Sequence, residues 1–166
     1  MKKIVKFGGS SLADATQFKK VAKIIKSDES RRFVVPSAPG KRFSEDIKVT
    51  DLLYQAYNAK DNKTFETIFN QIKHRFQNII DELNLDLSLE NEFKVIKKAF
   101  LEKVGIDYAA SRGEYLNGIV LANYLGFEFI DASEVIFIDE NGNYDETKTD
   151  PILSKRLSKV KNAVIP

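Results

Sequence analysis

The amino terminus carries the sequence feature that most constrains the fold: a short apolar run leads directly into two glycines and two serines. Lys3–Phe7 has the length and composition of a strand, and Gly8, Gly9, Ser10 and Ser11 follow it. Adjacent glycines are typical of backbone that adopts unusual angles or comes very close to another group. The run therefore predicts a strand that ends in a tight turn and leads into a helix.

Lys6 is the unusual residue of this strand, because a lysine within a buried strand is costly unless its ammonium group meets a negative partner. Just before the glycines it would lie at the carboxyl end of the strand, where open α/β sheets bind ligands. Free backbone N–H groups beside a cation can bind phosphate, so this stretch is a plausible phosphate site. The glycine spacings of the P-loop and of the dinucleotide-binding motif are both absent. The alternative is an ordinary strand-to-helix turn, with Lys6 extending along a sheet edge into water.

Composition limits the class of protein. The 166 residues, 43% of them hydrophobic, are enough for one domain with a substantial core. Basic and acidic residues number 26 and 24, so charge gives no reason to expect a nucleic-acid partner. The absence of cysteine excludes a disulfide framework, a thiolate zinc site and a thiol nucleophile, and we expect no metal bound by the chain itself. A strand that begins this early and the lack of a long apolar run predict a cytoplasmic protein with no membrane partner.

A second strand ends in a turn of unusual chemistry. Asp14 is a good cap for a helix that ends near Lys26, and 33–35 is a short apolar strand. Strand, helix and strand predict a right-handed βαβ unit. The following Pro36-Ser37-Ala38-Pro39-Gly40-Lys41 is then a stiff turn at the same edge of the sheet as Gly8 and Gly9, and 42–49 is expected to be a flap or mobile loop.

The middle of the chain predicts two amphipathic helices, over 63–83 and from Ser88 to near Gly105. Their aromatic residues follow the helical period, which indicates core packing. His74, the single histidine, lies off the apolar stripe and is expected to be a solvated surface residue. Helix pairs of this kind commonly form an insertion or a lid, here around 60–105.

Two polar residues each allow a capping role and a binding role. Thr50 or Asp51 can cap a helix that turns Leu53 inward. Ser111 and Glu114 have the spacing of a capping box ahead of an apolar helical stripe. Capping alone would explain both, but a carboxylate at a helix start, beside a glycine, could also bind an ammonium group.

The last part of the chain predicts further strands. Residues 126–131 and 135–138 are apolar segments, the second followed by a turn at 141–143. A polar loop is expected over 144–150, and Pro151 suits the first turn of a helix through Ser158. A further strand is expected from Ala163. The fold class is therefore α/β, with a largely parallel central sheet and flanking helices.

Three blocks of this sequence resemble aspartokinases. Lys6-Phe7-Gly8-Gly9-Ser10-Ser11-Leu12-Ala13-Asp14 is similar to the opening signature of that family. The serine turn around Ser37 with the threonine-headed segment 49–53, and Ser111-Arg112-Gly113-Glu114, are similar to two later blocks in the same order. The resemblance covers essentially the whole chain.

The resemblance implies an amino-acid-kinase fold, similar to carbamate kinase, and transfer of the ATP γ-phosphoryl group to L-aspartate. The product would be 4-phospho-L-aspartate, the entry to lysine, threonine and methionine. ATP with its Mg²⁺ and L-aspartate would be the ligands. Catalysis would depend on Lys6. Further roles follow block by block: phosphate binding by Lys6, Phe7, Gly8, Gly9 and Ser10, and aspartate binding by Ser37, Thr50 and Glu114.

The resemblance also has departures. The stretch 42–47 separates Gly40 from the threonine-headed helix, where some family members have almost nothing. Family members continue into a nucleotide-binding half and regulatory domains, so we expect residues 1–166 to form an acceptor half-site with little or no activity alone, and the longer enzyme to be a homo-oligomer. Two alternatives stay open: a related kinase with another acceptor, and a non-catalytic module that binds an acidic metabolite.

Overall fold

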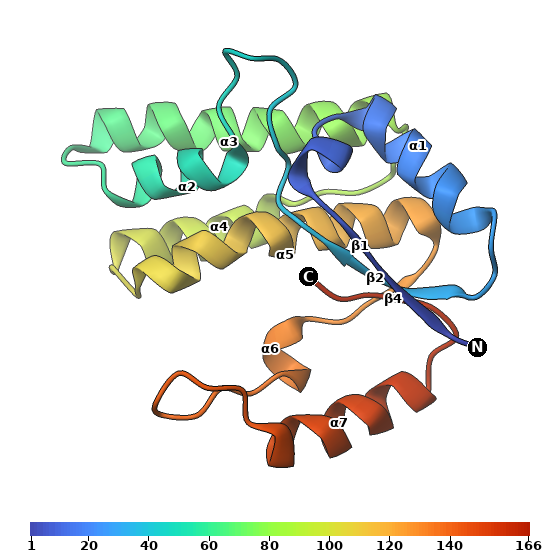
Figure 1. Ribbon diagram of the computed structural model, residues 1–166. Coiled ribbons are helices and arrows are strands. Elements are labelled where there is room, and N and C mark those ends of the chain that lie inside the picture. The colour runs from blue at the N-terminus through green and yellow to red at the C-terminus, as the bar shows by residue number, and fades with distance from the viewer.

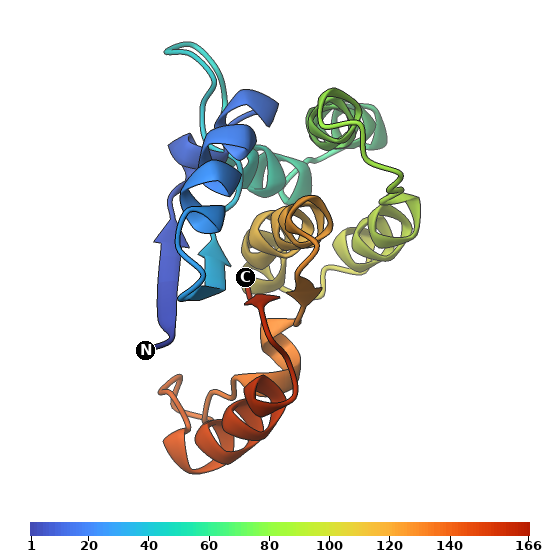
Figure 2. The ribbon, with the colours of Figure 1, turned by 90° about the vertical axis from the view of Figure 1, so that its right-hand side faces the viewer.

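The strands of the protein form one parallel sheet that lies between two unequal groups of helices (Figures 1 and 2). The computed structural model describes residues 1–166. The strands are β1 (Lys3–Phe7), β2 (Arg31–Pro36), β3 (Glu128–Phe129) and β4 (Ala163–Val164). The helices are the 3₁₀-helix η1 (Gly9–Leu12) and α1 (Ala15–Lys26), α2 (Val49–Tyr57), α3 (Asn62–Glu82), α4 (Glu90–Leu101), α5 (Ile106–Leu125), α6 (Ala132–Val135) and α7 (Glu146–Ser158).

The sheet confirms the predicted α/β class. Its order is β1-β2-β4-β3, and every neighbouring pair is parallel. Val5 pairs with Val34, and Phe33 pairs with Ala163. The helix between β1 and β2 begins as predicted, because the Asp14 side chain accepts a hydrogen bond from the Gln17 N–H at 2.9 Å. All strands point the same way, so the turns that follow β1 and β2 lie at one edge.

The expectation that Lys6 lies within a buried strand is wrong. β1 is the edge strand, and Ile4 is 70% exposed on it, while Lys6 is exposed as well. Val5 and Phe7 alternate with these residues and pack against the main core. An edge position lets the Lys6 ammonium group stay in water. Because the group is not buried, the fold does not require a negative partner for it.

The main core lies between the sheet and α1–α5, and it contains 29 buried residues. The apolar stripes predicted for the middle helices are confirmed. The Phe69 ring on α3 packs edge-on against Phe93 and Phe100 of α4, with centroids 6.0 Å and 6.1 Å apart. α3 and α4 therefore share one core with α1, α2 and α5, and their description as an insertion stays a prediction. His74 is exposed, as expected.

A smaller core lies on the other side of the strands, where α6 and α7 are seen in Figure 1. Phe33, Ile130, Val135 and Ala163 form it, with Leu157 of α7 packed against them. The strand predicted over 135–138 is wrong, since the backbone of this segment bonds to the region of α7 instead of the sheet. The N–H of Phe137 donates to Thr149 Oγ1 at 2.9 Å, and its carbonyl accepts from the Asp145 N–H at 2.9 Å.

α7 begins earlier than the sequence suggested. The Asp145 carboxylate accepts a hydrogen bond from the Lys148 N–H at 3.0 Å, so the helix begins at Glu146 and the loop predicted over 144–150 is largely helical. Pro151 consequently lies inside α7 and not in its first turn. The turn at 141–143 is confirmed, with Gly142 at φ 82° and an isolated bridge between Ile138 and Tyr144.

Candidate functional site

Two turns meet at the carboxyl edge of the sheet, as the sequence predicted. The Ser37 N–H donates to the Phe7 carbonyl at 2.9 Å, and the Gly40 N–H donates to the Gly9 carbonyl at 2.8 Å. A Cβ atom on Gly40 would lie 2.6 Å from the carbonyl carbon of Gly9, and one on Gly9 would lie 2.8 Å from the Ala38 carbonyl oxygen. Glycine is therefore required at both positions so that the two backbones can touch.

A cavity of about 400 Å³ opens beside these turns. It is lined by Gly9, Ser10, Ser37, Ala38, Pro39, Gly40, Lys41, Lys48, Thr50 and Glu114. The structure therefore brings together five of the predicted residues from four separate segments of the chain. Lys6, Phe7 and Gly8 are not among the lining residues: Lys6 is exposed on β1, and Phe7 contributes its carbonyl to the turn. The two lysines in the lining were missed, although both flank the stretch 42–47 that stood out in the sequence.

Glu114 does not cap a helix. α5 begins at Ile106, after Gly105, so Ser111 and Glu114 both lie in its interior. The Ser111 hydroxyl donates to the Tyr108 carbonyl instead, while Glu114 Oε1 accepts a hydrogen bond from the Ala38 N–H at 3.0 Å. The capping-box interpretation is therefore wrong, because α5 already begins at Ile106, ahead of Ser111. The second carboxylate oxygen of Glu114 has no partner in the chain and is available to a ligand.

Thr50 does not cap a helix either. α2 begins at Val49, and neither Thr50 nor Asp51 caps it, since the N-cap residue is Lys48 and no side chain bonds to the first turn. The start is fixed instead by the Val49 N–H, which donates to the Pro39 carbonyl at 3.1 Å. This bond joins the helix directly to the glycine turn, and it places Thr50 on the wall of the cavity.

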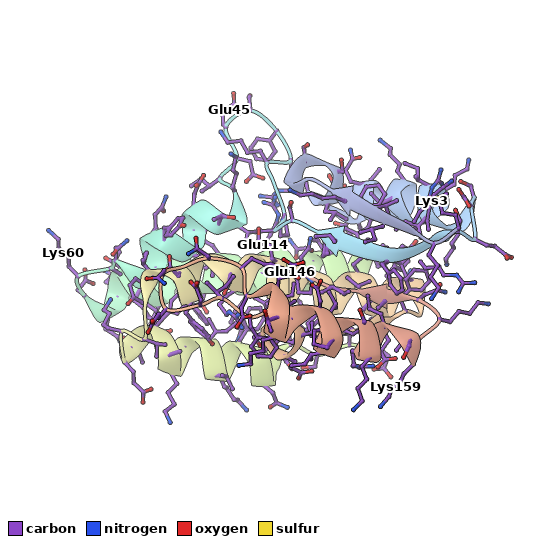
Figure 3. All side chains as sticks on the ribbon, turned by 60° about the horizontal axis from the view of Figure 1, so that its bottom comes forward. Lys3, Glu45, Lys60, Glu114, Glu146 and Lys159 are labelled. Carbon is purple, nitrogen blue, oxygen red and sulfur yellow. The ribbon has the colours of Figure 1, made fainter.

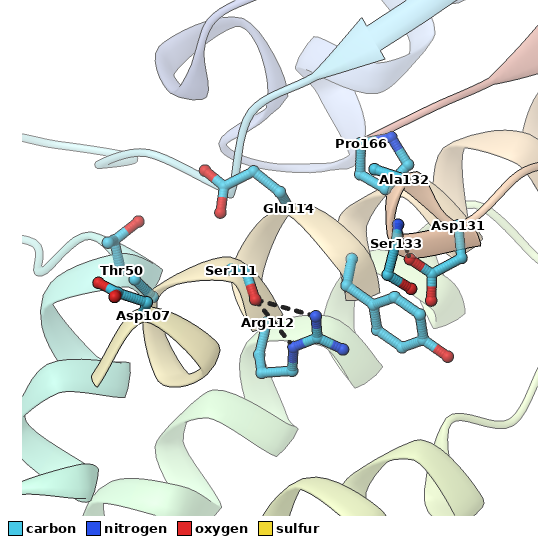
Figure 4. A pocket seen from close by; sticks show the side chains of 11 residues that line it. Thr50, Asp107, Ser111, Arg112, Glu114, Asp131, Ala132, Ser133 and Pro166 are labelled. Carbon is cyan, nitrogen blue, oxygen red and sulfur yellow. Dashed lines mark hydrogen bonds between the residues drawn. The ribbon is translucent and has the colours of Figure 1, made fainter. Parts of the chain in front are cut away.

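A second cavity, of about 530 Å³, shares Thr50 and Glu114 with the first (Figure 4). Its remaining lining includes the carboxylates of Asp107 and Asp131 and the guanidinium of Arg112. That guanidinium lies over the Tyr108 and Tyr115 rings, 4.4 Å and 4.6 Å from their centroids. The lining of this second cavity thus carries both negative and positive charge, and Glu114 stands where the two cavities meet.

Burial raises the pKa of Tyr115, and the negative charges of Asp131 and Glu92 raise it further. The Tyr115 phenol is consequently protonated over the physiological pH range and acts as a neutral hydrogen-bonding group in the wall. Tyr115 also packs edge-on against Phe129 of β3, with ring centroids 5.6 Å apart. The aromatic contact fixes α5 against the sheet on this side of the cavity.

The loop between the glycine turn and α2 is anchored by a buried ion pair that the sequence did not reveal. Asp46 Oδ2 lies 2.8 Å from Arg42 Nε and 2.7 Å from Arg75 Nη1. Arg75, which is 4% exposed on α3, also donates to the Gly40 carbonyl. The loop expected to be mobile is therefore tied at its base to α3, while Glu45 stands at its outer tip, well away from Glu114 (Figure 3).

The Asp46 pair predicts a specific dependence of stability on pH. Hydrogen bonds from Arg42 and then Arg75 hold the pKa of Asp46 well below its ordinary value of about 3.9. The folded protein thus binds fewer protons than the unfolded chain, and this stabilisation, complete above about pH 4, is lost as the pH falls below that value. We expect the free energy of unfolding, measured with urea, to decline less between pH 5 and pH 3 in Asp46→Asn. An equal decline in both proteins would contradict the assigned role of the pair.

No group of three or more histidine, aspartate or glutamate side chains is placed to hold a metal ion. None of the helices is long and apolar enough to cross a membrane. The site consists of two glycine turns, hydroxyl groups, lysines and one half-satisfied carboxylate at the edge of a parallel sheet.

Fold and site together define an α/β protein with a ligand cavity at the carboxyl edge of a parallel sheet, and the comparisons give its family. The sequence model of the amino acid kinase family matches residues 1–165, and the chain belongs to that family. Within it, the chain is similar to aspartate kinases. It is 35% identical over 142 residues to aspartokinase 3 of Bacillus subtilis (strain 168), covering 80% of this chain and 31% of the relative.

Solved structures show the same relationship. The aspartate kinase of Clostridium acetobutylicum is 48% identical, with a TM-score of 0.92 over all of this chain and 39% of that one. Escherichia coli aspartokinase III, crystallised with aspartate and ADP, is 20% identical and shares the fold with a TM-score of 0.73 over 99% of this chain and 40% of its own. The chain thus spans about a third of the length of the Bacillus relative. The predicted fold and family are confirmed.

Proposed function

We propose that residues 1–166 supply the acceptor side and the phosphate turn of an ATP-dependent aspartate kinase. The observation that carries this proposal is the cavity where Gly9, Ser10, Ser37, Thr50 and Glu114 converge. It is supported by 48% identity to the Clostridium acetobutylicum aspartate kinase over the whole chain. The nucleotide, with its Mg²⁺, is proposed as the second substrate, since the Escherichia coli relative was crystallised with aspartate and ADP.

The chemistry requires little proton transfer. A side-chain carboxylate is ionised near neutral pH, and it can attack the γ-phosphorus directly. One carboxylate oxygen forms a bond to phosphorus, the bond from the γ-phosphorus to the bridging oxygen of the β-phosphate breaks, and ADP leaves. Catalysis then depends on holding the aspartate carboxylate in line with the γ-phosphate and on cancelling the repulsion between these two anions.

The donors and cations of the site suit one part of the substrates, and its carboxylate suits another. The N–H groups of Gly9 and Ser10 make no hydrogen bond within the chain, and Lys41 and Lys48 line the same cavity. These groups suit the transferred phosphoryl group. On the other side, the free oxygen of Glu114 suits the α-ammonium group of the amino acid. The cavity thus offers a phosphate end and an ammonium end, a suitable arrangement for phosphorylation of an amino acid.

Titration of the chain with L-aspartate and with L-glutamate, followed by calorimetry, tests the acceptor. We expect aspartate to bind at least tenfold more tightly, which corresponds to about 1.4 kcal/mol. Hydroxylamine trapping of the acyl phosphate, with ATP present, measures turnover. Preference for glutamate would favour a kinase with another acceptor, and aspartate binding without turnover in any longer form of the protein would favour a binding module.

Three further expectations stay predictions: low turnover by residues 1–166 alone, a homo-oligomeric enzyme and a cytoplasmic location.

Lys6 is proposed as a phosphate ligand, although it lies outside the lining of the cavity. It precedes the glycine pair on β1, and its side chain is exposed and free to reach a bound nucleotide. In a form of the protein that includes the nucleotide-binding half, we expect Lys6→Ala to weaken ADP binding about tenfold, measured by calorimetry, because one ammonium–phosphate contact is lost. Lys20→Ala, which removes an exposed lysine from α1, is the matched control. Equal ADP affinity in the two variants would exclude Lys6 as a phosphate ligand.

A further inference from the structure

Asn117 is a polar side chain buried completely inside the core. It lies on α5, one helical turn after Glu114, and it is 0% exposed. Its Nδ2 group donates a hydrogen bond to the Ser37 carbonyl at 2.7 Å. Its Oδ1 atom is buried and has no hydrogen-bond partner. The contact with a carbonyl fixes the orientation of the amide, because only the NH₂ group can donate.

Together with Glu114, Asn117 holds both polar atoms of a single peptide bond. Glu114 accepts from the Ala38 N–H at 3.0 Å, and Asn117 donates to the Ser37 carbonyl at 2.7 Å. α5 comes close enough for this because Gly113 faces the turn: a Cβ atom there would lie 2.6 Å from Ala38 Cβ. The Ser37–Ala38 peptide is part of the wall of the cavity. One face of α5 therefore sets the position of that wall.

Stability alone gives a poor account of an asparagine at this position. A buried amide oxygen without a partner destabilises the folded state, because its hydrogen bonds to water are lost and not replaced. An apolar side chain would avoid that cost. The benefit of the residue must come from the group that does bond, and that group acts only on the Ser37 carbonyl.

We infer that Asn117 is a positioning residue for the acceptor amino acid. It does not touch the ligand, since its side chain is sealed from the cavity. It fixes the Ser37–Ala38 peptide, so that Ser37 lines the cavity while the same peptide binds one oxygen of Glu114 and leaves the other for an ammonium group. This role rests on the proposed function, in which that ammonium group belongs to aspartate.

The test compares Asn117→Ala with Asn123→Ala, which removes an exposed asparagine from the same helix. We expect the affinity for L-aspartate, measured by calorimetry well below the melting temperature, to fall about tenfold in Asn117→Ala and to stay unchanged in the control. A second variant, Asn117→Asp, adds a pH readout. Its carboxyl group can donate to the Ser37 carbonyl only when protonated, so its aspartate affinity relative to the parent protein should recover as the pH is lowered.

Wild-type affinity in Asn117→Ala, or a constant affinity ratio for Asn117→Asp across the pH range, would overturn the inference. If Asn117→Ala does not fold, the pH dependence of Asn117→Asp decides. If the wild-type protein binds no aspartate, the proposed function fails. The positioning role is then tested separately by the rate of hydrogen exchange at the Ala38 amide. Faster exchange in Asn117→Ala than in Asn123→Ala would support the role, and equal exchange would exclude it.

Discussion

Substituting alanine for Gly40 is expected to abolish detectable aspartate binding and to destabilise the protein by about 3 kcal/mol, because the new methyl group overpacks a rigid contact. Its Cβ atom would lie 2.6 Å from the carbonyl carbon of Gly9 and 2.7 Å from the Ser10 nitrogen. Both neighbours are backbone atoms, so no side-chain rotation relieves the clash. The two turns must separate, and the bond from the Gly40 N–H to the Gly9 carbonyl is lost.

Gly8 provides the matched control for this prediction. It belongs to the same glycine pair as Gly9, but a Cβ atom on it would meet nothing within 4 Å, and its φ of −74° suits any residue. Gly8→Ala should therefore keep wild-type stability and aspartate affinity. Urea unfolding and calorimetry of the two variants measure both quantities. A Gly40→Ala protein that binds aspartate as tightly as Gly8→Ala would show that the contact of the two turns does not form the site.

Local patterns in the sequence were sufficient for the first half of the sheet and for the helices α1 and α3. The strand Lys3–Phe7, the Asp14 cap and the shared edge of the two turns follow from neighbouring residues and from the geometry of parallel sheets. Capping signals were less reliable. Ser111 and Glu114 have the spacing of a helix start, yet α5 begins at Ile106 and both residues lie inside it. A capping bond would need Ser111 ahead of the helix, whereas its hydroxyl donates to the Tyr108 carbonyl within α5.

The parts of the site that could not be predicted are buried polar contacts between distant residues. Arg75 meets Asp46 across 29 positions of the chain, and Asn117 meets the Ser37 carbonyl across 80. On the sequence, Arg75 resembles any charged residue of an amphipathic helix, and Asn117 interrupts an apolar stripe without a visible reason. Their partners are known only once the helices are packed. Glu114 was predicted from the resemblance, but its bond to Ala38 was not.

That bond allows the two roles of Glu114 to be separated by substitution. Glu114→Gln keeps a side-chain oxygen that can accept from the Ala38 N–H, while it removes the negative charge. We expect it to unfold at the same urea concentration as the parent protein and to bind aspartate about thirtyfold more weakly, since a charged hydrogen bond to an ammonium group stabilises by roughly 2 kcal/mol.

Glu114→Ala removes the charge and also the acceptor for the Ala38 N–H. It should lose at least as much aspartate affinity as Glu114→Gln, and in addition about 1 kcal/mol of stability, because a half-buried donor is left without a partner. Glu140→Gln, at an exposed position, controls for the change of net charge. If Glu114→Gln binds aspartate like Glu140→Gln while Glu114→Ala does not, Glu114 only supports the turn, and the ammonium group must be sought at Asp131 or Asp107, which line the second cavity together with Glu114.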